Sequence, residues 1–107
     1  MDRDRVETKT NGWFIGDFPL AVHRTSDFEV SWMRHPKGQE WPRHHHKIAK
    51  EINLLIRGKM LINNEEINVG DIFVLHPGES AKPTFLEDCE LIVVKTPSCP
   101  GDKYLDE

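Results

Sequence analysis

Three consecutive histidines, followed five residues later by Glu51, are the side chains of this sequence best suited to chemistry. Alternate side chains of a strand point to opposite faces, so His44 and His46 share one face and His45 points to the other. If the chain folds back through residues 47–50, Glu51 lies across from the two histidines, with Cβ atoms about 5 Å apart. Two imidazoles and one carboxylate with open coordination positions match the facial triad of non-haem iron oxygenases. The spacing therefore predicts a divalent-metal site.

The overall composition predicts one folded domain with no nucleic-acid or membrane partner. The chain has 107 residues, of which 37% are hydrophobic and 30% charged, and its formal net charge is −4. A nucleic-acid groove requires a basic stripe, and no apolar run approaches the roughly 18 residues that span a bilayer. We expect residues 1–11 to be a flexible, solvated segment and residues 12–107 to form a single domain. Without a signal-peptide pattern, a cytoplasmic location is expected.

Short apolar stretches separated by turn residues predict an all-β fold. No segment has a long 3.6-residue period. The expected strands cover residues 12–20, 28–34, 51–57, 59–62, 65–69, 72–75, 84–86 and 90–95. In the second of these, Phe28, Val30 and Trp32 share one face, which we expect to form part of the wall of a sandwich or small barrel. Residues 96–101 contain two prolines and are expected to be irregular.

The segment from Gly38 to Gly58 resembles the first signature of the cupin superfamily. That signature requires a glycine, two histidines separated by one residue, a glutamate and a second glycine, and all five positions match in type and spacing. The resemblance covers roughly residues 32–95. It implies an all-β, double-sheet jelly roll that holds one metal ion inside its barrel, with His44, His46 and Glu51 as the ligands.

The second cupin signature is degraded in residues 70–81. Pro77 stands one position later than the signature requires, and Ala81 occupies the place of the expected fourth histidine ligand. His76 is the candidate substitute, although its position beside a Pro-Gly turn suits a structural role equally well. Fewer protein ligands leave more coordination positions open to water or substrate.

Four residues are candidates for binding a substrate in the barrel. Asn53 and Arg57 share a strand face with Glu51, and a guanidinium suits a carboxylate or phosphate. Arg57 lies at the end of its strand, where it can instead reach solvent. Lys82 could neutralise an anion, and Trp41 could form a lip of the pocket that stacks on a ring, or simply belong to the core.

The opposite face of the same strand predicts a homodimer. Ile52, Leu54 and Ile56 point out of the barrel if Glu51 points inward. Each buried aliphatic side chain contributes about 1.5–3 kcal/mol, which favours covering this stripe with a second copy of the chain.

The leading functional hypothesis is a cupin that binds Fe, Mn, Ni or Zn and acts on a small polar or anionic metabolite. Carbohydrates and hydroxy- or keto-acids are the expected classes, and the reaction is left open between oxygenase, isomerase and lyase chemistry. One alternative is a non-catalytic cupin that binds a sugar or small acid. Another is a metal-free sugar isomerase or epimerase with a histidine base. The sequence does not identify catalytic residues, because the fold hosts many functions.

Overall fold

The computed structural model describes residues 1–106 and is built almost entirely of β-strands. Two short 3₁₀ helices, η1 (Val6–Thr8) and η2 (Thr10–Gly12), precede the first strand. The strands are β1 (Trp13–Ile15), β2 (Glu29–His35), β3 (His44–His45), β4 (Lys50–Arg57), β5 (Met60–Ile62), β6 (Glu65–Ile67), β7 (Ile72–Leu75), β8 (Pro83–Phe85), β9 (Cys89–Thr96) and β10 (Tyr104–Leu105).

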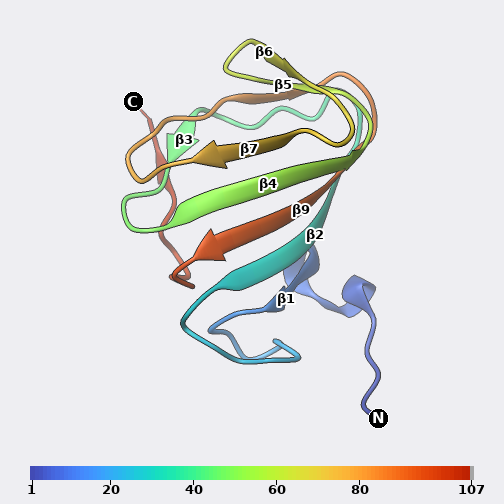
Figure 1. Cartoon of the computed structure of the whole chain (residues 1–107), viewed down its shortest axis with the longest axis vertical. Coiled ribbons are helices and arrows are strands. Elements are labelled where there is room, and N and C mark those ends of the chain that lie inside the picture. The colour runs from blue at the N-terminus through green and yellow to red at the C-terminus, as the bar shows by residue number, and fades with distance from the viewer. Residues whose placement is uncertain (107) are drawn as a thin grey trace.

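The first layer is an antiparallel sheet of five strands in the order β1-β2-β9-β4-β7 (Figure 1). Its two longest strands, β4 and β9, lie side by side near its centre and pair along most of their length. Glu29, Lys95 and Glu51 stand directly opposite one another on β2, β9 and β4. Because opposed residues share a face, these three charged side chains form one row on the inner side of the sheet.

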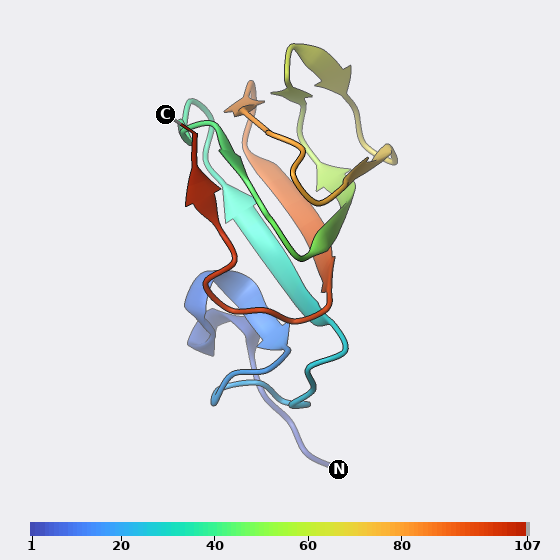
Figure 2. The ribbon, with the colours of Figure 1, turned by 90° about the vertical axis from the view of Figure 1, so that its left-hand side faces the viewer.

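The second layer combines the sheet β6-β5-β8 with the strand pair β10-β3. Isolated bridges from Glu40 to Thr84 and from His44 to Ala81 join the two parts. The C-terminal strand β10 runs antiparallel to β3, and Figure 2 shows this strand in red beside the green segment. The histidine run therefore lies between β10 on one side and residue 81 on the other.

The hydrophobic core fills the space between the two layers. Apolar residues from both contribute, namely Leu55, Met60, Ile62, Leu75, Ala81, Phe85, Cys89, Leu91 and Val93. Alternation along each strand places these side chains inward. This two-layer antiparallel arrangement is the jelly roll that the sequence predicts.

The expected strands are confirmed within one or two residues, except for the first. Strand β1 ends at Ile15, and the following residues form bends and turns up to residue 28. The turn between β5 and β6 uses Asn63 and Asn64 with φ angles of 50° and 67°. Asparagine tolerates this conformation. Residues 97–101 are irregular as expected, whereas β10 was not predicted.

The inner face of β2 differs from the expectation. Glu29, Ser31 and His35 are buried, whereas Trp32 is half-buried and Phe28 is exposed. The polar side chains of β2 therefore face the interior. Their partners are the Asn11 carbonyl, which accepts a hydrogen bond from Ser31, and Lys95, which stands opposite Glu29.

The predicted hairpin between the histidines and Glu51 is also wrong. Strand β3 pairs with β10, and β4 pairs with β7 and β9, so the two segments belong to different layers. The carboxylate of Asp102 accepts hydrogen bonds from the amides of residues 47, 48 and 49, at 3.0, 3.0 and 2.9 Å. These bonds occupy amide groups that would otherwise be available for a turn linking paired strands.

No helix within residues 1–106 is long and apolar enough to cross a membrane.

Candidate metal centre

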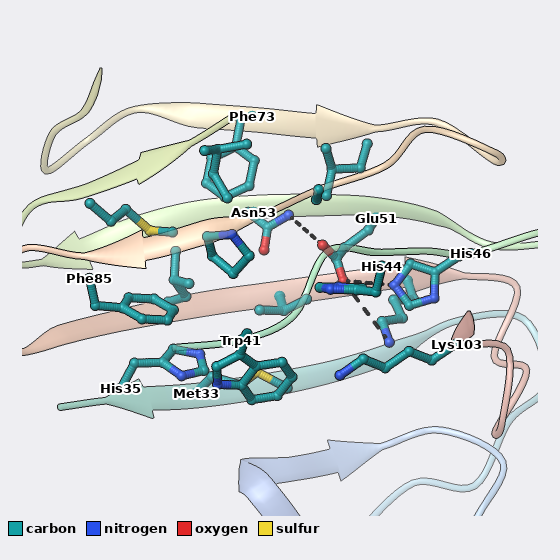
Figure 3. A pocket seen from close by; sticks show the side chains of 18 residues that line it. Met33, His35, Trp41, His44, His46, Glu51, Asn53, Phe73, Phe85 and Lys103 are labelled. Carbon is teal, nitrogen blue, oxygen red and sulfur yellow. Dashed lines mark hydrogen bonds and ion pairs between the residues drawn. The ribbon is translucent and has the colours of Figure 1, made fainter. Parts of the chain in front are cut away.

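A cavity of about 80 Å³ lies between the two layers (Figure 3). His44, His46, Glu51 and Asn53 form part of its wall, and aliphatic and aromatic side chains supply most of the remainder. Ligand pockets for drug-sized molecules are about 300–1,000 Å³. This cavity is therefore suited to an ion together with a small molecule.

His44 is held in position by two neighbouring segments. Its backbone exchanges two hydrogen bonds with Ala81, at 3.0 and 2.8 Å. Its side-chain Nδ1 lies 3.0 Å from the carbonyl oxygen of Pro42. A carbonyl can only accept, so Nδ1 carries the proton and Nε2 keeps its lone pair. Burial lowers the pKa of His44, which favours the neutral imidazole that a metal requires.

His46 is fixed in the same tautomer by the C-terminal segment. Its Nδ1 donates to the backbone carbonyl of Asp102. Asp102 is itself anchored through its side chain, which is buried and bound to the three amides that follow His46. Histidine ligands of metals commonly donate their second ring nitrogen to a carbonyl or carboxylate in this way. Nε2 of His46 is thus left with its lone pair directed away from Asp102.

The buried Nε2 atom of His46 faces a carboxylate oxygen. It lies 3.4 Å from Oε1 of Glu51. Within the described chain, it is the only buried side-chain nitrogen or oxygen without a hydrogen-bond partner. A lone pair and a carboxylate repel each other unless a proton or a metal cation lies between them. Two atoms that each lie about 2.0–2.2 Å from one ion are about 3–3.4 Å apart, so the observed separation fits two ligands of one metal.

Neighbouring side chains orient Glu51 and keep it charged. Asn53 donates to Oε2 at 3.1 Å, and Nζ of Lys95 lies 4.0 Å from Oε1. Burial by itself would raise the pKa of Glu51, but a hydrogen bond from His46 when Nε2 carries a proton, the charge of Lys95 and the Asn53 amide together lower it. An ionised carboxylate is the form that coordinates a metal.

These donors fit a divalent cation, although the cluster is not closed. Across residues 1–106, no three His, Cys, Asp or Glu side chains stand close enough to form a complete metal-binding group. His46 and Glu51 are at ligand separation, and the ring of His44 lies 5.7 Å from that of His46, centroid to centroid. The pair is therefore the preformed part of the site, and His44 borders it in the same cavity.

The candidate fourth ligand does not reach the cavity. His76 is exposed, and its backbone amide donates a hydrogen bond to the Glu79 carboxylate at 2.9 Å in a surface turn. Ala81 is 2% exposed and lines the cavity next to His44, at the position where cupins place their additional histidine. The structure thus gives His76 a turn role and leaves open space at Ala81.

Of the four predicted substrate-binding residues, the structure brings Asn53 and Trp41 to the cavity. Arg57 is exposed and pairs with Glu90 at 3.4 Å. Lys82 is also exposed, and its ammonium group lies 3.4 Å from the Trp41 carbonyl. Neither of these two cations lines the cavity.

Two other lysines supply positive charge at the cavity, and sequence reasoning missed both. Lys95 follows the inward residues Cys89, Leu91 and Val93 of β9, and this alternation could have revealed it. Lys103 comes from the irregular C-terminal segment, and its ammonium group lies 3.9 Å from the centre of the Trp41 ring. Burial and the proximity of Lys95 lower the pKa of Lys103. No sequence pattern indicates its location.

His45 points away from the cavity that His44 and His46 line, as predicted. Its Nδ1 lies 2.6 Å from Oδ1 of Asp106, and its ring stacks on Tyr104 with centroids 5.7 Å apart. Both partners belong to the C-terminal segment, so His45 secures β10 against β3.

Comparison with known proteins supports the jelly-roll assignment. The family model described as the ChrR cupin-like domain matches residues 9–100. An uncharacterized protein with a double-stranded β-helix domain from Klebsiella pneumoniae is 25% identical, with a TM-score of 0.67 and 80% of each chain covered. Among proteins with curated functions, none matches this chain in sequence.

Two further solved structures share the fold at lower identity. The DMSP lyase DddQ from Ruegeria pomeroyi is 17% identical with a TM-score of 0.72, and the match covers 87% of this chain and 49% of the lyase. KdgF from Halomonas sp. is 21% identical with a TM-score of 0.63, covering 71% and 74% of the two chains.

Proposed function

Because the chain belongs to the family of ChrR cupin-like domains, we propose that it binds a divalent metal and acts on a small anionic metabolite. The observation that carries the proposal is the orphaned Nε2 atom of buried His46, which faces Glu51 at 3.4 Å. A cation between these two atoms satisfies both. The ligand-like separation of these two atoms, with His44 in the same cavity, supports the metal-dependent alternative over a metal-free isomerase.

His44, His46 and Glu51 would hold the metal, with Fe, Mn, Ni and Zn as the candidates. The ion would act as a Lewis acid that polarises a carbonyl or carboxylate oxygen of the ligand. Asn53 and Lys95 keep Glu51 oriented and ionised. Ala81 leaves space beside His44, where a ligand can approach the ion.

The charges around the cavity support an anionic ligand. Lys95 and Lys103 both line the cavity, and each would attract a carboxylate. The volume of about 80 Å³ limits the ligand to roughly five to eight non-hydrogen atoms in this conformation. We therefore favour a short carboxylic acid, such as a hydroxy- or keto-acid, over a sugar.

Binding of short carboxylates tests this proposal. Zinc-loaded protein should be stabilised against thermal unfolding by millimolar 4-hydroxybutyrate, because ligands of the native state raise its stability. Changing either Lys95 or Lys103 to methionine should weaken apparent binding by about 10-fold. Lys82→Met serves as the control and should leave binding unchanged. No stabilisation of the wild type, or an equal loss in all three variants, would contradict the proposal.

A non-catalytic cupin that binds a small acid is the second candidate. It is favoured by one observation, the alanine at the position of the additional histidine ligand. This candidate predicts the same ligand-induced stabilisation without chemical change of the acid. Incubating metal-loaded protein with a panel of short hydroxy- and keto-acids and analysing products by mass spectrometry separates the two functions.

The outer face of the five-stranded sheet supports the proposed homodimer. Ile52 and Leu54 face outward, and their cross-strand neighbours extend them into two apolar rows, Val30–Val94–Ile52–Val74 and Trp32–Ile92–Leu54–Ile72. Ile72 is 66% exposed and Ile56 is 40% exposed. Contiguous apolar surface of this kind marks interaction sites. A second copy would cover it through a two-fold contact of the same face.

Substituting one exposed position of this face tests the dimer. Ile72→Glu should convert the protein to a monomer, because each interface would then carry two buried carboxylates near the two-fold axis. Val69→Glu is the matched control, since Val69 is 61% exposed and lies outside β7. Size-exclusion chromatography with light scattering at micromolar concentration distinguishes the states. A monomeric wild type would contradict the proposal.

A further inference from the structure

The end of the cavity farthest from the metal ligands contains a third inward histidine. His35 is the last residue of β2, is 6% exposed and lines the cavity. Its ring stacks on Phe85, with centroids 4.2 Å apart and planes inclined by 14°. Figure 3 shows His35 and Phe85 at the opposite end of the cavity from His46 and Lys103.

Hydrogen bonds assign the tautomer of His35. Oε1 of Gln39 lies 2.9 Å from Nε1 of Trp41 and 2.6 Å from Nδ1 of His35. An indole nitrogen can only donate, so the atom of Gln39 that it contacts is an acceptor. Nδ1 of His35 must therefore also donate, and it carries the proton. Burial lowers the pKa of His35, which keeps the ring neutral and leaves a lone pair on Nε2.

Nε2 of His35 borders open space. In the described chain, the side-chain hydrogen bonds of His35 involve Nδ1 alone. The only fully enclosed side-chain nitrogen or oxygen without a partner within residues 1–106 is Nε2 of His46. Nε2 of His35 is consequently not fully enclosed, and His35 lines this cavity as well as two neighbouring hollows that include Arg34. This nitrogen is a hydrogen-bond acceptor whose orientation is fixed by the bond of Nδ1 to Gln39.

The surroundings make this acceptor distinctive. His35 stacks on Phe85, and the apolar part of the cavity wall also includes Met33, Met60 and Leu91. A single indole, that of Trp41, separates His35 from the metal site, since the centroid of Trp41 is 5.4 Å from His35 and 6.3 Å from His44. A ligand that spans this distance meets cations at one end and an acceptor at the other.

We propose that His35 is a specificity residue, whose Nε2 accepts a hydrogen bond from the terminal hydroxyl of a short ω-hydroxy acid. This inference rests on the proposed function, because it assumes that the carboxylate of the acid is bound at the metal, Lys95 and Lys103. The acid's carbon chain lies along the apolar wall. Gln39 and Trp41 are positioning residues, since they fix the protonated nitrogen of His35 and leave the other nitrogen free.

Paired ligands that differ by one hydroxyl test the proposal. The pairs are 3-hydroxypropionate with propionate, 4-hydroxybutyrate with butyrate, and 5-hydroxypentanoate with pentanoate, each titrated calorimetrically into zinc-loaded protein. In the wild type, the hydroxy acid of at least one pair should bind roughly 3- to 10-fold more tightly than its parent acid. His35→Phe keeps the stacking on Phe85 but lacks the acceptor, so this ratio should fall to about one while binding of the parent acid persists. His76→Phe, at a histidine outside the cavity, should retain the wild-type ratio.

The outcomes separate this inference from the proposed function. Equal affinities for both members of all three pairs in the wild type overturn the role of His35 and leave the carboxylate site intact. If His35→Phe keeps the wild-type preference for the hydroxy acid over its parent acid, the role of His35 is likewise overturned and the carboxylate site stays intact. Failure of the wild type to bind any of the six acids overturns the proposed function, and the inference falls with it. Equal wild-type affinities for the hydroxy acids and their parent acids would overturn the role of His35 even if His35→Phe does not fold.

Discussion

Replacing His46 by alanine should abolish tight binding of divalent metal. Nε2 of His46 and Oε1 of Glu51 are the two donors already at ligand separation, 3.4 Å apart. Loss of a residue that merely orients a ligand costs 10–100-fold in metal affinity, so loss of the ligand itself should cost more than about 100-fold. Competition titration with zinc and a chromophoric chelator at pH 7.5 measures the effect.

His45→Ala is the control for this substitution. His45 belongs to the same run of histidines but contacts Asp106 and Tyr104 instead of the cavity. Its removal should leave zinc affinity within a few-fold of the wild type and lower stability only slightly, since a partly exposed ion pair contributes up to about 1 kcal/mol. Equal zinc affinities for the His46 and His45 variants would show that the histidine run does not bind metal through the cavity.

The second large effect is expected at Gly58, the last glycine of the first cupin signature. Its φ angle is +89°, and a Cβ atom would lie 2.3 Å from the backbone oxygen of Asp88 and 2.8 Å from Sγ of Cys89. Alanine must therefore adopt a left-handed conformation and displace the start of β9 as well. We expect Gly58→Ala to lower the free energy of unfolding by about 3 kcal/mol or more.

Gly38→Ala separates these two contributions. Gly38 has a similar φ angle of +80°, but no atom lies within 4 Å of the position of its Cβ. Its substitution should cost only the backbone term, about 1–2 kcal/mol. Urea denaturation of the metal-free variants, compared with the wild type, measures both. Equal losses at the two positions would show that the approach of residue 88 to Gly58 is not a tight contact.

Local patterns were sufficient to predict most of the strands and the inward pair of histidines. The two-residue period along residues 44–46 depends only on strand geometry, and it correctly placed His45 on the opposite face from His44 and His46. The same period failed for β2, because apolar Phe28 and Trp32 suggested an inner face. Polar Ser31 and Glu29 instead face inward beside Asn11 and Lys95, which lie 20 or more residues away in the sequence.

Long-range contacts account for the rest of what the sequence did not reveal. The tautomer of His46 depends on Asp102, which is 56 residues away, and no local pattern connects the two. Lys103 reaches the cavity from a segment that lacks any periodicity. By contrast, Lys95 continues the alternation of β9 and could have been placed inside the barrel once that strand was recognised.

The dependence of His46 on Asp102 has a consequence for biosynthesis. Asp102 fixes the proton of His46 through its backbone carbonyl and binds the three following amides through its carboxylate. This residue is translated more than fifty residues after His46. While the ribosome is still adding the final strands, the imidazole of His46 is free to rotate and to exchange tautomers. If the proposed function holds, capture of a metal in this geometry would follow synthesis of the segment that contains Asp102 rather than synthesis of the histidine run.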